Sequence, residues 1–104
     1  FQDGAFDYAV LGEVIEHLEN PQGAIDEAMR ILKKGGTLAI STPLEEAIEP
    51  GAVDAHRHLW SFSENDLKQM LSKHGEVKFS VVGSQFFPTY KYRWKTLFAF
   101  VTKK

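Results

Sequence analysis

The chain has 104 residues, 43% of them hydrophobic and 12% aromatic, a composition that favours one folded domain with a real core and argues against disorder. Its 12 Lys and Arg residues against 14 Asp and Glu residues give a formal net charge of −2, which provides no basic field for DNA and no polybasic membrane anchor. The absence of cysteine excludes disulfides, thiolate nucleophiles and cysteine-ligated zinc, and no run approaches the ~20 apolar residues of a membrane helix, so we expect a soluble, cytoplasmic protein.

The stretch FDYAVLGEVIEHL, residues 6–18, predicts a short apolar strand over residues 8–11 that leads into an acid-rich turn. Glu13, Glu16 and His17 lie in that turn, and their spacings of three and four would place them on one face of a helical turn. In an open α/β sheet, ligands bind beyond the carboxyl ends of parallel strands. We therefore expect the functional site at this turn.

An amphipathic helix and a second strand follow. Asn20 can cap free amide groups, and Pro21 suits the first helical position. Apolar residues then recur at helical spacing on one face: Ile25, Ala28, Met29 and Leu32. Glycines at 35 and 36 can take the left-handed conformation that closes such a helix. The run TLAIST, residues 37–42, predicts a short strand buried on both faces.

The second half of the chain begins with a long connection, because residues 44–60 are acidic, contain Pro and Gly and show no periodicity. The sequence SEND at residues 63–66 is typical of a capping box and predicts a second helix that Gly75 ends. Residues 77–81 alternate as a strand, and residues 96–102 form the last strand.

This order of elements predicts an α/β fold with a partial Rossmann-like sheet of about four strands and two main helices. The first three strands are linked through helices and should be parallel, whereas the last should be antiparallel to its neighbours. Parallel sheets normally carry helices on both faces, and two helices cover such a sheet sparsely. We therefore expect part of the natural domain to be missing from this chain.

Several segments resemble class I S-adenosylmethionine-dependent methyltransferases of the type 11/23 kind. FDYAVLGEVIEH resembles the family's strand and E-x-x-E-H turn, RILKKGG resembles its R-x-L-K-P-G-G turn with Lys34 in place of Pro, and ISTP resembles its next strand. HLWSFSENDLKQMLSKHG resembles a later helix, and TLFAFVTKK resembles the antiparallel last strand. The resemblance implies methyl transfer from S-adenosylmethionine to an unidentified small-molecule or RNA acceptor.

The resemblance also implies that residues 1–104 are a single domain, the C-terminal half of this fold. The family's glycine-rich cofactor turn belongs to the other half, and this sequence contains no Gly-x-Gly. Of the family's cofactor contacts, only the strand-end segment matches: Leu11, Gly12, Glu13 and Val14. We therefore expect the isolated chain to be inactive, with the missing N-terminal half or a partner chain completing the cofactor site.

By the same resemblance, Glu13 and His17 are the candidate catalytic residues, as a base or an orienting group. The set Glu13, Glu16, His17 and His58 also resembles the metal site of small-RNA terminal 2′-O-methyltransferases, and its oxygen and imidazole ligands would suit Mn²⁺ or Mg²⁺. The other interpretation is that E-x-x-E-H is common among methyltransferases without a metal, with His17 orienting the cleft loops. We favour this second interpretation and expect no metal.

Two features permit a different class of function. The run YKYRWK at residues 90–95 could stack bases, but its alternation is also what a half-buried strand shows, and we favour the strand. The first strand would normally lie beside a strand of the missing half, so its edge is open, and open edges recruit partners. The alternative function is a non-catalytic interaction module, in which this chain pairs with another chain, forms a homodimer or is capped by its own N-terminal residues.

Overall fold

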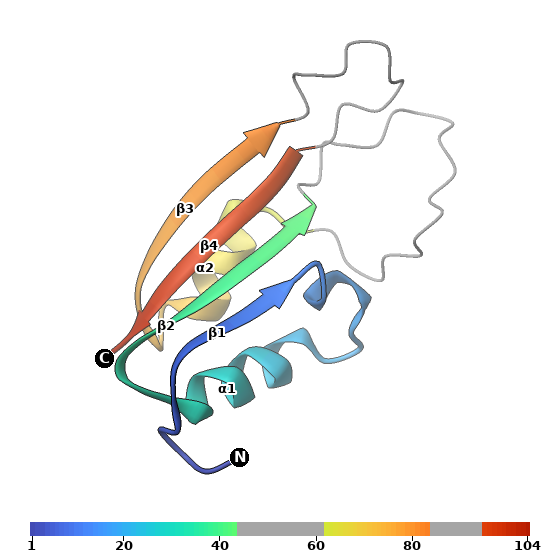
Figure 1. The fold of residues 1–104 in the computed structure, drawn as a ribbon. Helices are drawn as coiled ribbons and strands as arrows, with labels where there is room; N and C mark the ends of the chain where they lie inside the picture. The colour runs from blue at the N-terminus through green and yellow to red at the C-terminus, as the bar shows by residue number, and fades with distance from the viewer. Residues whose placement is uncertain (44–61, 84–94) are drawn as a thin grey trace.

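The computed structural model describes residues 1–43, 62–83 and 95–104 (Figure 1). The elements follow the predicted order: β1 (Phe6–Gly12), the 3₁₀ turn η1 (Ile15–His17), α1 (Pro21–Ile31), β2 (Leu32–Pro43), α2 (Glu64–Leu71), β3 (Gly75–Gly83) and β4 (Lys95–Lys103). The predicted connection at 44–60 and most of the run at 90–95 lie outside the described residues.

The strands form one sheet in the order β1-β2-β4-β3. β1 and β2 are parallel, and β4 lies between β2 and β3 and is antiparallel to both. The last strand is therefore antiparallel to its neighbours, as predicted, but the expectation of three parallel strands is wrong, since only β1 and β2 form a parallel pair. The central position suits β4 because Leu97, Ala99 and Val101 are fully buried, which an edge strand would not achieve.

The core lies between the sheet and the two helices, which cover the same face of the sheet (Figure 1). From α1 it receives Ile25 and Met29, and from α2 it receives Leu67 and Leu71, all at most 1% exposed. Burying each of these side chains stabilises the fold by roughly 1.5–3 kcal/mol. The strands contribute the residues that alternate toward the helices: Leu38, Ile40, Leu97, Ala99 and Val101.

The opposite face of the sheet has no helix over it among the described residues. On β1, Tyr8 is 77% exposed and Val10 is 72% exposed. The strand register aligns Val10 with Ala39 and Ala39 with Phe100, so these side chains belong to one surface. We call this surface the open face. The sequence had led us to expect sparse cover, because two helices are few for a sheet of this kind.

Local signals in the sequence placed the helix starts correctly. The Asn20 side chain accepts a hydrogen bond from the Gly23 amide at 3.0 Å, and Pro21 opens α1. Ser63 and Asp66 form the predicted capping box of α2, with hydrogen bonds of 3.1 and 2.9 Å. The contact at the end of α1 was not predicted, because it comes from a residue far along the chain. Lys103 of β4 donates a hydrogen bond to the Leu32 carbonyl at 2.7 Å and places a cation at the negative end of the helix.

Residues 1–4 lie at the C-terminal end of α1 rather than along the edge of β1. The Gly4 amide donates to the Arg30 carbonyl at 3.1 Å, and Arg30 forms an ion pair with Asp3. The sheet order leaves β1 with one neighbour, β2, within the described residues. In that same part of the chain, no helix is long and apolar enough to cross a membrane.

Candidate active site at the carboxyl end of β1

The turn after β1 is built around an unusual backbone conformation at Glu13. Its φ is +54°, and it is the one non-glycine residue with a positive φ in the described part of the chain. The Glu13 amide donates to the Ser41 carbonyl at 2.9 Å and lies 3.2 Å from the Ser41 hydroxyl, which ties the turn to β2. Such conformations are costly for residues with a side chain and gather at functional sites.

Glu16 is the buried member of the turn. It is 1% exposed, and its Oε2 accepts a hydrogen bond from the Thr42 hydroxyl at 3.0 Å. Its Oε1 is also buried and has no hydrogen-bond partner among the described residues. A buried carboxyl oxygen without a donor is costly, so this atom indicates a role other than stability.

The Glu13 carboxyl has a raised pKa. Burial is the largest cause, followed by repulsion from Glu16 and a hydrogen bond to the Glu16 side chain, while His17 acts in the opposite direction. The two carboxyl groups therefore meet at this end of the sheet. A carboxyl group whose pKa lies closer to neutral is better suited to exchange protons with a substrate.

His17 follows Glu16 in the 3₁₀ turn. Its Nε2 lies 3.7 Å from Glu16 Oε1, and its side chain is 40% exposed. The structure thus brings together Glu13, Glu16 and His17, but not on one face of a helix as predicted. The left-handed residue and the 3₁₀ turn direct Glu16 into the core and leave His17 at the surface.

The predicted cofactor-contact segment runs from the end of β1, an edge strand within the described residues, into this turn. Leu11 packs against the core, whereas Gly12 is exposed. A Cβ at Gly12 would meet only the Ser41 hydroxyl, at 3.7 Å, so the packing of this chain does not itself require glycine there.

The metal interpretation receives no ligand cluster from the described residues, since no group of three His, Cys, Asp or Glu side chains there could hold a metal ion. His58, the fourth residue of that set, lies outside the described residues. The metal interpretation therefore stays a prediction.

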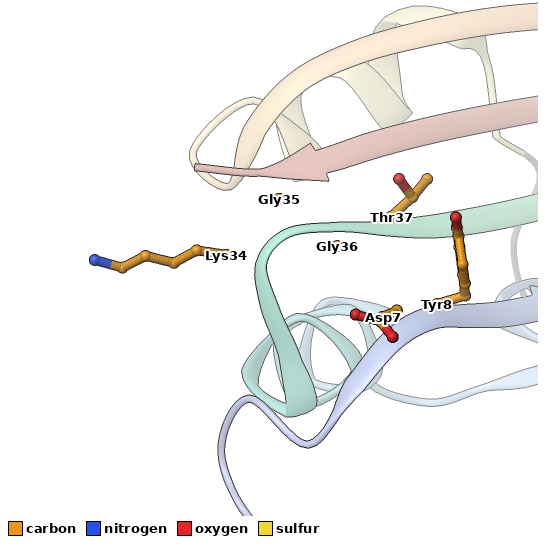
Figure 2. A pocket seen from close by; sticks show the side chains of 6 residues that line it. All are labelled: Asp7, Tyr8, Lys34, Gly35, Gly36 and Thr37. Atoms are coloured by element: carbon orange, nitrogen blue, oxygen red, sulfur yellow. The ribbon is translucent and has the colours of Figure 1, made fainter.

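A separate pocket of about 270 Å³ lies at the amino ends of β1 and β2, away from the acidic turn. Its lining residues are Asp7, Tyr8, Lys34, Gly35, Gly36 and Thr37. Figure 2 shows Lys34 extending away from this pocket, with Tyr8 and Thr37 standing on the same side of the sheet. It is no candidate site, because α/β sheets bind ligands at the other end of their strands.

Sequence reasoning missed two residues of the site, Ser41 and Thr42. A signal for Thr42 was present, because it continues the alternation of Leu38 and Ile40 and so had to face the core. A buried threonine needs a hydrogen-bond acceptor, and a nearby acidic turn offers one. Ser41 gave no comparable signal, since its role depends on the parallel register of Gly12 with Ser41.

Comparison with known proteins gives a family match and a consistent set of structural neighbours. A family model described as a methyltransferase domain matches residues 1–77. An uncharacterized protein of Methanocaldococcus jannaschii is 45% identical over 40 residues, which is 38% of this chain and 20% of that protein.

Two solved structures illustrate the likeness in fold. A SAM-dependent methyltransferase from Thermotoga maritima, described as a possible histamine N-methyltransferase, matches 99% of this chain with 25% identity and a TM-score of 0.74. Phosphoethanolamine N-methyltransferase 2 from Haemonchus contortus, in complex with S-adenosyl-L-methionine, matches 100% of this chain with 11% identity and a TM-score of 0.69. The present chain spans 58% of the first protein and 35% of the second.

Proposed function

Because the chain belongs to the class I methyltransferase-domain family, we propose that it is part of an enzyme that transfers a methyl group from S-adenosylmethionine to a small-molecule or RNA acceptor. The observation that carries this proposal is the Glu13 turn, where a left-handed backbone and two carboxyl groups meet at the carboxyl end of a parallel strand pair. That end of an α/β sheet is where ligands bind.

Leu11, Gly12, Glu13 and Val14 are the residues that would hold one edge of the cofactor. When bound, S-adenosylmethionine supplies an electrophilic methyl group on a sulfonium centre. The chain's own contribution is to position the acceptor and to take up its proton, and proximity accounts for much of the rate in such reactions. Glu13 is our candidate base, and His17, half-exposed beside Glu16, is the candidate orienting residue.

We propose further that the isolated chain is inactive, because it is the C-terminal half of the catalytic domain. Two observations support this: the sequence has no glycine-rich turn, and the open face carries apolar side chains that a second layer would cover. The missing half, or a partner chain, would supply the glycine-rich turn and the layer that covers the open face.

Titration of the chain with S-adenosylhomocysteine tests this proposal, with amide chemical shifts followed from Leu11 to His17. We expect no saturable change, since one edge of a site binds poorly. Adding the N-terminal half of the natural protein should produce saturable shifts at the same amides. Saturable micromolar binding by the chain alone would contradict the proposal that its cofactor site is incomplete. If no binding occurred with both halves present, residues 11–14 would not form part of a cofactor site.

One observation favours a second function, a non-catalytic interaction module. β1 is an edge strand with two exposed apolar side chains, Tyr8 and Val10, and such edges pair with other strands. The occupant would be a second copy of the chain or another protein with a free strand. Self-association without cofactor binding in the completed protein would favour the module over the enzyme.

A further inference from the structure

The 3₁₀ turn η1 places a buried carboxyl group next to a surface imidazole. Glu16 is 1% exposed, whereas the following residue, His17, has a side chain that is 40% exposed. His17 Nε2 nevertheless lies 3.7 Å from Glu16 Oε1, which is within ion-pair distance but longer than a hydrogen bond. The imidazole ring therefore lies between the core and the surface, with its Nε2 on the side of the buried carboxyl group.

The carboxyl group of Glu16 is anchored in the core. Its Oε2 accepts a hydrogen bond from the Thr42 hydroxyl at 3.0 Å, and Thr42 is fully buried on β2, where it pairs with Leu97 of the central strand β4. The backbone of the turn is also held, because the His17 amide donates to the Val14 carbonyl at 3.0 Å. Glu16 Oε1 is thus kept beside the imidazole ring.

Oε1 is also the atom of this carboxyl group that lacks a donor. It is buried and has no hydrogen-bond partner among the described residues, which is costly for a carboxylate oxygen. Thr42 already donates to Oε2, and a neighbouring carboxylate such as ionised Glu13 has no proton to donate. The imidazole N–H of His17 is a donor within reach. Catalytic hydrogen bonds are often long in the free enzyme and shorten when substrate binds.

We propose that Glu16 is a positioning residue for His17, whose Nε2 donates a hydrogen bond to Glu16 Oε1. This bond fixes both the orientation of the ring and the position of its proton. A neutral imidazole carries one proton, and a carboxylate, which can only accept, draws that proton to the nitrogen that faces it. Nδ1 is then the acceptor nitrogen of the ring. Through Thr42, the same arrangement is tied to the centre of the sheet.

The use of this arrangement in catalysis rests on the proposed function, in which His17 is the candidate orienting residue. A neutral ring with its proton on Nε2 can orient a substrate at Nδ1 only through a hydrogen bond that the substrate donates. The arrangement therefore favours a methyl acceptor that carries a hydroxyl group or an amine N–H. An acceptor without such a hydrogen, such as a tertiary amine or a thioether, would not be held in this way.

The position of the imidazole proton can be measured from the ¹⁵N chemical shifts of the two ring nitrogens in the unmodified chain, without cofactor. The pH is raised until the His17 shifts stop changing, so that the ring is neutral, and His17→Gln identifies its signals. We expect the proton on Nε2. In Glu16→Gln the ratio of the Nε2–H form to the Nδ1–H form should fall about threefold or more, because an amide is a weaker acceptor than a carboxylate and can itself donate.

The chain provides an internal reference at His74, whose Nε2 lies 2.8 Å from Asp26 Oδ1. His74 should show the Nε2–H form, and Glu16→Gln should leave its signals unchanged, which also shows that the variant is folded. Glu19→Gln is the matched control, because it removes an exposed carboxyl group just after the same turn. It should leave the His17 ratio unchanged.

A second measurement needs no variant. A proton held between Nε2 and a buried oxygen should exchange with water slowly enough to be observed directly in the ¹H–¹⁵N spectrum of the ring. Three results would each overturn the positioning role: a neutral His17 with its proton on Nδ1, an Nε2 proton that exchanges as fast as in an unfolded peptide, or a ratio that Glu16→Gln does not move.

These measurements separate the positioning role from the proposed function. If the chain completed by its N-terminal half binds S-adenosylhomocysteine but the His17 ratio does not respond to Glu16→Gln, the positioning role is wrong and the proposed function stands. If the ratio responds but the completed protein does not bind S-adenosylhomocysteine, the proposed function is wrong and the contact between Glu16 and His17 stands.

Discussion

Glu13 holds a backbone conformation that a glutamate adopts only at a cost, because a left-handed φ of +54° brings its Cβ close to the backbone. Glycine avoids this cost. We expect Glu13→Gly to be more stable than Glu13→Ala by about 1 kcal/mol, since both variants remove the carboxyl group but only glycine removes the strain. Urea unfolding of the two variants measures the difference.

Glu19 provides the control for this comparison, because its φ is negative and its side chain is exposed. At that position glycine should be less stable than alanine, since glycine has more chain entropy to lose on folding. If alanine were also preferred at position 13, the turn would store no strain.

The sequence pattern pointed to the turn after β1 as the candidate site but could not give the environments of its side chains. The E-x-x-E-H spacing predicted that Glu13, Glu16 and His17 would share one face of a helical turn, whereas the structure places them in one turn but on different sides. It could not predict that Glu16 is buried and His17 half-exposed, because that difference arises from the left-handed residue before a 3₁₀ turn. The partner of Glu16, Thr42, lies 26 residues away and meets it only through the parallel pairing of β1 and β2.

Among the elements, the two helices are joined by polar contacts centred on Asp26 of α1. Its carboxylate contacts His74 at 2.8 Å and Lys73 at 3.1 Å, both just after α2, and it accepts from Gln22 at 2.9 Å. Burial alone would raise the pKa of Asp26, but these hydrogen bonds outweigh it and the pKa is lowered. The ionised form of Asp26 therefore stabilises the folded chain.

Asp26→Asn should accordingly destabilise the chain in a way that depends on pH. A carboxyl group with a lowered pKa adds stability above its unfolded value of 3.8, and this is lost as the pH falls through the folded pKa. Because the side chain is 41% exposed, we expect a loss of at most ~1 kcal/mol at neutral pH. Urea unfolding at neutral pH and well below pH 3.8 measures the difference in unfolding free energy between Asp26→Asn and the unmodified chain. This difference should become small in acid.

The control for this variant is Asp7→Asn, because Asp7 is 71% exposed and its Lys33 partner is 3.8 Å away. It should change the unfolding free energy little at either pH. If the difference in unfolding free energy between Asp26→Asn and the unmodified chain stayed constant with pH, the charge of Asp26 would not be what stabilises the contact between the helices.

Element starts were predictable because caps act locally, as at Asn20 and Ser63. Strand order was not, because β4 enters the sheet centre through packing that no local pattern records. Gly75 illustrates the difference. Its predicted role was to end a helix, but it begins β3, where a Cβ would overlap the Thr102 carbonyl of β4.

For the molecule as a whole, the main physical problem is the uncovered side of the sheet. Tyr8, Val10 and Phe100 are 77%, 72% and 40% exposed on the open face, and within the described residues one edge of β1 has no neighbouring strand. Exposed apolar surface of this kind tends to be buried against a partner. Our last prediction therefore concerns self-association of the isolated chain.

We expect the weight-average mass in sedimentation equilibrium to rise with concentration, because a second copy can pair along β1 and cover the open face. Val10→Lys should weaken this association at least about tenfold, ~1.4 kcal/mol, since a charged side chain on an edge strand opposes pairing. Val82→Lys makes the same change of charge at a 55% exposed valine of β3, the opposite edge strand, and should have a smaller effect if pairing uses β1. Amide exchange gives an independent reading, because the β1 amides that do not bond to β2 should become protected only at high concentration. A monomer at every concentration would reject the interaction module and favour the proposed N-terminal half of the domain as the cover for this face.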